Sequence, residues 1–172
     1  MDSGLAALLG AAVGSAATLG AAIVNGRFQA RSQHAQQSRQ HRRDAYTRYL
    51  GALHDRDLAL DAVLDALRPD RPDLIAVEEL TARFVTLARE VHKSCEVVIL
   101  EGPATVTAVA ERVTNASADL SYVMRSMAEN ARAGDTTRKA ELSALATERE
   151  RALYEAVKEF RLAARAAIGQ AV

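Results

Sequence analysis

His92 and the single cysteine, Cys95, are the residues whose types and spacing come nearest to a metal-binding pair. A helix would place these two side chains on one face, and imidazole and thiolate are both zinc ligands. A zinc site would need two further ligands from another helix, and the remaining histidines are His34, His41 and His54. The chain contains no C-x-x-C, H-E-x-x-H or Glu-x-x-His arrangement to complete the set. The sequence therefore predicts no metal and no other cofactor, with Cys95 at the edge of a core and His92 in solvent.

The other reactive residue types form no catalytic arrangement. Serines and histidines do not fall into a pattern that would activate a nucleophile, and no glycine-rich loop could cradle a phosphate. The carboxylates recur at the intervals expected on the solvated faces of helices. The sequence thus predicts a protein that is not an enzyme.

A band of arginines is the most distinctive charge feature. The chain carries 22 basic and 22 acidic residues, yet residues 27–48 hold six arginines and one aspartate, a net charge of +5. Nucleic-acid binding is not predicted, because residues 49–172 hold sixteen basic and twenty acidic residues, a net charge of −4. The band is expected to mark membrane topology or to contact anionic lipid through Arg27, Arg31, Arg39, Arg42 and Arg43.

The arginine band directly follows a run without charge, from Ser3 to Gly26. Its length matches the roughly 20 residues that a helix needs to cross a bilayer. No Lys or Arg precedes it, as a cleaved export signal would require. Residues 1–26 are therefore predicted to be a single transmembrane anchor in the inner (plasma) membrane. The positive-inside rule places the N-terminus outside and the C-terminal domain in the cytoplasm. The alternative is a soluble helix, rich in Ala and Gly, that packs against the bundle or another copy.

Small residues recur every four positions within that run. This spacing lets two transmembrane helices approach closely, so it predicts self-association in the membrane. The alternative is that a segment rich in Ala and Gly produces such spacings by chance. The predicted face consists of Ala6, Gly10, Gly14 and Thr18.

The rest of the chain has the pattern of long amphipathic helices. Turn-forming residues at 68–73, 101–103 and 133–135 separate stretches in which apolar residues recur every three or four positions. We expect an all-α fold in which the N-terminal transmembrane helix continues through a basic juxtamembrane helix (27–44) into an antiparallel, up-down four-helix bundle (45–172). The rival is a three-helix bundle with the first helix as a separate stalk. The first helix should bury one stripe, namely Tyr46, Tyr49, Leu50, Leu53, Leu60, Val63, Leu64 and Leu67.

The order of these parts resembles that of small actinobacterial single-span membrane proteins. They have an Ala/Gly-rich N-terminal span, an Arg/Gln-rich stretch and an RRDAY-type start to a helical domain. Here those parts are residues 4–26, residues 27–41 and the run from Arg42 to Tyr46. The resemblance covers the first third of the chain and implies a cytoplasmic helical domain, without implying an activity.

Together these features predict a membrane-anchored helical bundle that acts by protein association. Its expected partners are the lipid bilayer and either further copies of itself or another protein. One alternative is a soluble helical protein that oligomerises through the Ala/Gly-rich segment. The other is a small-molecule sensor, which would need a cavity in the bundle lined by Phe84, Cys95, Met124 and Met127.

Overall fold

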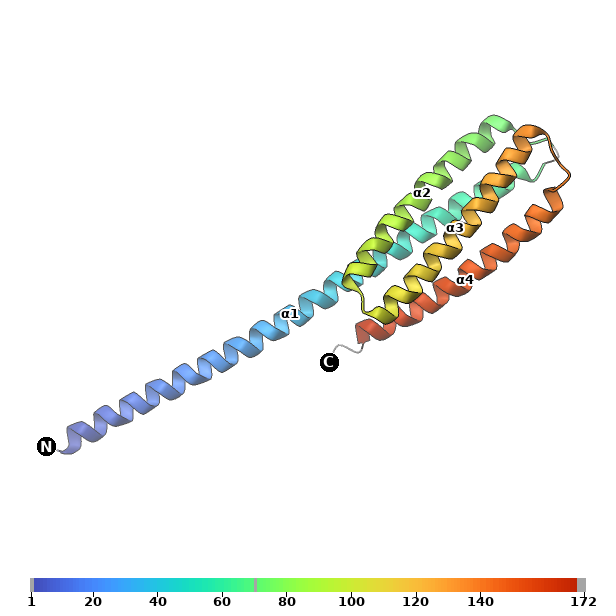
Figure 1. The fold of residues 1–172 in the computed structure, drawn as a ribbon. Helices are drawn as coiled ribbons and strands as arrows, with labels where there is room; N and C mark the ends of the chain where they lie inside the picture. Colours follow the sequence, from blue (N-terminus) through green and yellow to red (C-terminus); the bar gives the residue numbers. More distant parts are fainter. Residues whose placement is uncertain (1, 70, 170–172) are drawn as a thin grey trace. The chain divides into compact units, whose positions relative to one another are not determined.

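The described residues of the chain fold into four α-helices. In the computed structural model, the backbone is described for residues 2–69 and 71–169, and the side chains for residues 29, 32–69 and 71–169. The helices are α1 (Asp2–Leu67), α2 (Leu74–Glu101), α3 (Ala104–Ala133) and α4 (Lys139–Gly169), as Figure 1 shows. The chain divides into two compact units, residues 1–40 and residues 41–172. The described part of the first unit is helical, and the second is an up-down four-helix bundle, which confirms the predicted all-α bundle.

The bundle core forms because each helix buries one stripe. On α1 the stripe advances by alternate steps of three and four residues, which keeps it on one face of the helix. Tyr46, Tyr49 and Val63 are at most 2% exposed, whereas Leu50 and Leu64 are only half-buried. The α1 stripe meets α4 through Phe160, whose ring packs edge-to-face against Tyr46 and Tyr49. The three-helix alternative is therefore wrong, because residues 45–67 belong to the core.

The helix ends follow local rules. Asp73 caps the N-terminus of α2, because its Oδ1 accepts hydrogen bonds from the backbone N–H groups of Ile75 and Ala76. Gly134 ends α3 with a φ of 66°, a left-handed conformation that glycine adopts without steric cost. Pro103 directly precedes α3, in extended conformation, and its carbonyl accepts hydrogen bonds from the backbone N–H groups of Val106 and Thr107.

Gly102 is required between α2 and α3 for a different reason. A Cβ at this position would lie 2.7 Å from the carbonyl oxygen of Val98 and 3.3 Å from the hydroxyl of Tyr46. A larger residue would therefore push the α2–α3 turn away from α1.

Within the part of the chain that the structure describes, no helix combines the length and the apolar character needed to span a membrane. The uncharged run 3–26, on which the predicted anchor rests, lies outside the residues to which this finding applies.

Candidate functional site

The small-residue face and the start of the arginine band lie outside the residues whose side chains are described. These predicted site residues are Ala6, Gly10, Gly14, Thr18, Arg27 and Arg31. The other three arginines are described, and two of them bond to backbone carbonyls. Arg39 donates from Nε to the carbonyl of Ala35 at 3.3 Å, while Arg43 is exposed.

Arg42 contributes to the bundle itself. Its Nε donates to the carbonyl oxygen of Glu101 at 2.9 Å, at the C-terminus of α2. A cation at this end of a helix satisfies a carbonyl that lacks an intrahelical partner and interacts favourably with the helix dipole. Arg42 therefore ties α1 to the end of α2 across 59 positions of sequence.

His92 and Cys95 do not form a metal site. Cys95 is 2% exposed, within the core, while the His92 ring is on the surface with its Nε2 3.8 Å from Glu96. Among the described residues, no group of three His, Cys, Asp or Glu side chains is placed to hold a metal ion.

The most unusual feature of the bundle is a buried arginine that the sequence analysis missed. Arg56 lies on α1 and is 0% exposed. Its guanidinium sits 5.1 Å from the centre of the Phe84 ring on α2, and Nη2 donates to the carbonyl oxygen of Ser117 on α3 at 3.4 Å. Nη1 is 3.4 Å from the carboxylate of Asp57, and Nε has no hydrogen-bond partner. The side chain thus crosses the core and ends between α2 and α3.

Burial is the largest cause of the pKa shifts of Arg56 and of its neighbour Asp57. Burial lowers the pKa of Arg56, while the neighbouring Asp57 opposes that shift. Burial also raises the pKa of the Asp57 carboxyl, and the Arg56 guanidinium partly offsets the rise. Because an arginine keeps its proton in proteins, the core holds a positive charge whose carboxylate partner is about half exposed.

Three further buried polar residues on α2 and α3, which with Arg56 we call the polar layer, are Thr81, Ser117 and Ser121. The carbonyl of Ser117 also accepts from Ser121 Oγ at 2.7 Å, so this one oxygen has two donors. On α2, the Thr81 side chain is 9% exposed, and its Oγ1 has no partner. Unpaired buried polar groups are rare in native proteins, and among the described residues they are Thr81 Oγ1, Arg56 Nε and the Tyr46 hydroxyl.

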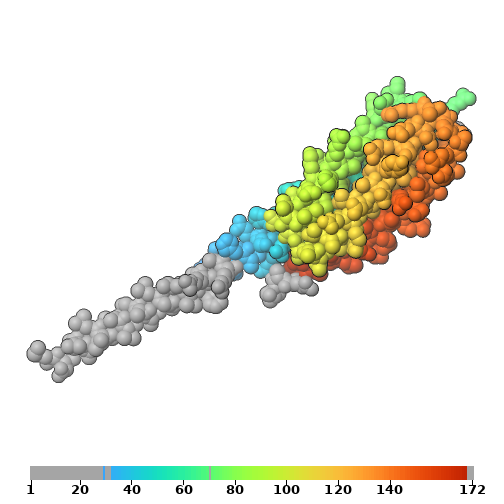
Figure 2. Space-filling model, viewed as in Figure 1, coloured from blue at the N-terminus to red at the C-terminus, as the bar shows by residue number. Residues whose placement is uncertain are grey.

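The surface above the polar layer is hollowed. Two hollows of about 410 and 540 Å³ lie between α2 and α3, and they share Val85, Arg89 and Arg125 as lining residues. We call this continuous depression the α2–α3 groove. In Figure 2, α2 (green) and α3 (yellow to orange) lie side by side on the face shown.

The sensor hypothesis gains no support from these hollows. A further pocket of about 390 Å³ lies beside the α1–α2 and α3–α4 turns, next to the Glu78 and Arg132 end of the groove, and Met127 lines it. The other three residues expected to line a cavity, Phe84, Cys95 and Met124, are buried in the core and line none of these three pockets.

Comparison with protein-family models, with curated proteins and with solved structures found no match. The class is therefore defined by the structure: an all-α, up-down four-helix bundle with a charged arginine in its core.

Tyr49 gives the core a predictable response to alkaline pH. Burial raises the pKa of its hydroxyl well above the ordinary 10.0, and the hydrogen bond with Thr114 opposes the shift. Since the folded pKa exceeds the unfolded one, this contribution to stability is complete below pH 10 and is lost as the pH rises further. Chemical denaturation between about pH 9 and 11 should reveal a weaker loss of stability in Tyr49→Phe than in wild type. Tyr122→Phe, at an exposed position, should match the wild-type slope; equal slopes in all three proteins would contradict the assignment.

Proposed function

We propose that this protein is a single-span, membrane-anchored helical bundle that acts by protein association. One observation carries the proposal: the uncharged run 3–26, the arginine band and the first helix of the bundle all belong to one helix, α1 (Asp2–Leu67). A bilayer would hold the uncharged run, and the arginines would remain on the cytoplasmic side. The bundle would then present its helical surfaces beside the inner membrane.

Association in the membrane would use the face of Ala6, Gly10, Gly14 and Thr18. Small side chains at this spacing allow two helix backbones to pack closely. The proposed partners are thus the lipid bilayer, a second copy and a protein bound by the bundle. Of the predicted lipid contacts, Arg27 and Arg31 follow the run most closely, whereas Arg42 is already bonded to Glu101.

Membrane fractionation with cysteine crosslinking tests the anchor and the self-association together. The full chain with its native N-terminus is expected in the membrane fraction and should resist extraction at alkaline pH. In a Cys95→Ala background, Gly14→Cys should give a disulfide-linked dimer. Leu8→Cys, on the opposite face of an ideal helix, should give little.

The two parts of the proposal fail separately. Recovery of the chain as soluble protein would refute the anchor. Membrane recovery with equal crosslinking from both positions would refute the small-residue interface while leaving the anchor intact.

A further inference from the structure

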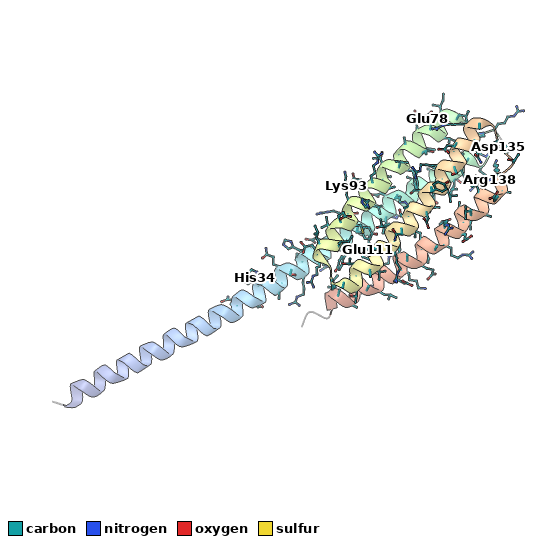
Figure 3. The ribbon with its side chains drawn as sticks, viewed as in Figure 1. His34, Glu78, Lys93, Glu111, Asp135 and Arg138 are labelled. Carbon is teal, nitrogen blue, oxygen red and sulfur yellow. The ribbon has the colours of Figure 1, made fainter. Side chains whose placement is uncertain are left out.

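The α2–α3 groove has the dimensions of a helix-binding site. On α2 it extends from Glu78 to Lys93, both labelled in Figure 3, and on α3 from Thr114 to Arg132. This span corresponds to about 22 Å along a helix, or roughly four turns. Small residues line much of it, so a second backbone can approach closely. These are Ala82, Ala88, Ser117, Ala118, Ser121 and Ala128.

Unpaired polar groups lie in and beneath the groove. The Thr81 side chain lines the groove, yet its buried hydroxyl has no partner in the described structure. Directly inside, Ser117 separates the groove from the Arg56 guanidinium, whose Nε is also unpaired. The wall of the groove therefore holds hydrogen-bonding capacity that the described residues leave unused.

The charge of the groove identifies the chemistry of its occupant. One half is lined by Arg89, Arg125 and Lys93, with no carboxylate among its lining residues, although Lys93 is paired with Glu90 at 2.6 Å. In the other half, Arg132 and Glu78 are 3.4 Å apart, and Glu129 is a second carboxylate in the lining. A cationic groove stands out here because residues 49–172 carry a net charge of −4. Electrostatic complementarity therefore favours an acidic partner and disfavours a second copy of this acidic bundle.

From these features we propose that the α2–α3 groove binds an acidic amphipathic helix of a partner protein. The small residues receive the apolar face of that helix, and its carboxylates meet Arg89 and Arg125. Arg89 is exposed and makes no ion pair with a residue whose side chain is described. The inference rests on the proposed function in that it names the surface used for protein association.

The test measures binding of a labelled helical peptide to the full chain in detergent micelles. The probe has about 16 residues, with Ala and Leu on one face and Glu along both edges of that face. Fluorescence anisotropy should reveal saturable binding that weakens as salt rises. Arg89→Glu combined with Arg125→Glu should weaken it at least about tenfold. Ala118→Trp, which fills the groove, should have a similar effect.

Controls separate the groove from general charge. Arg83→Glu changes an exposed arginine of α2 outside the groove and should alter binding less than about twofold. A probe with Gln in place of Glu should bind more weakly than the acidic probe. Circular dichroism should confirm that every variant retains the helical fold.

Three outcomes would overturn the proposal. One is the absence of saturable binding, and another is binding that the groove variants do not change. The third is self-association lost in the same variants, which would identify a second copy as the occupant. The anchor is judged independently by fractionation: membrane recovery without peptide binding rejects the groove alone, whereas peptide binding by a soluble chain rejects the anchor alone.

Discussion

Replacing Phe160 by alanine is expected to lower the free energy of unfolding by about 4 kcal/mol. Phe160 is fully buried on α4, and its ring centre lies 5.9 Å from that of Tyr46 and 5.0 Å from that of Tyr49. Truncation removes apolar contacts, leaves a cavity and breaks two edge-to-face pairs, each contributing about 0.5–1.5 kcal/mol beyond area burial. Because those pairs join α4 to α1, the variant should lose much of the packing between the two helices.

Chemical denaturation of the full chain, followed by circular dichroism, measures this loss. Tyr154→Ala is the matched control, since Tyr154 is an aromatic residue of the same helix and is 63% exposed. It should change stability by no more than about 0.5 kcal/mol. Similar losses in the two variants would contradict the assignment of Phe160 to the core of the α1–α4 interface.

The helices and the turns were predictable because local sequence determines them. Apolar residues at steps of three and four define a buried stripe. The Asp73 side chain caps the start of α2, and Gly134 ends α3 in a left-handed conformation, both of which are local effects. The spacing between neighbouring helices was not predictable, because it depends on how each helix is rotated about its own axis. The α2–α3 groove is an example: small residues such as Ala88 and Ala118 line it and leave space between the two helices.

Arg56 was missed although the sequence contained a signal. Leu53 and Leu60 are seven positions apart, and a step of three from Leu53 reaches Arg56, which therefore occupies a core position. The sequence alone predicts that such an arginine is exposed and interrupts the apolar stripe, since charged residues are almost never fully buried unless paired. Only the fold reveals that Phe84 and the carbonyl of Ser117 accommodate it. Arg42 is similar, because its bond to Glu101 joins segments that the sequence does not place together.

Replacing Arg56 by methionine is expected to raise the free energy of unfolding by about 2 kcal/mol, because a buried charge with weak partners is costly. The Arg56 contacts with Ser117 and Asp57 are both 3.4 Å long, at the outer limit of a hydrogen bond, and Nε is unpaired. Methionine can fill much of the space over Phe84, and the Ser117 carbonyl keeps its 2.7 Å bond from Ser121. A gain of stability in this variant would leave Arg56 a role other than stabilisation, such as specifying how the four helices align.

Two measurements decide between these roles of Arg56. Arg83→Met, at an exposed position on α2, should leave stability within about 0.5 kcal/mol of wild type. In Arg56→Met, the pKa of Asp57 should rise above its wild-type value, because the guanidinium that lowers it is lost while burial, which raises it, remains. A loss of stability in Arg56→Met would instead establish that the contacts with Phe84, Ser117 and Asp57 outweigh the desolvation of the charge. The polar layer would then stabilise the bundle.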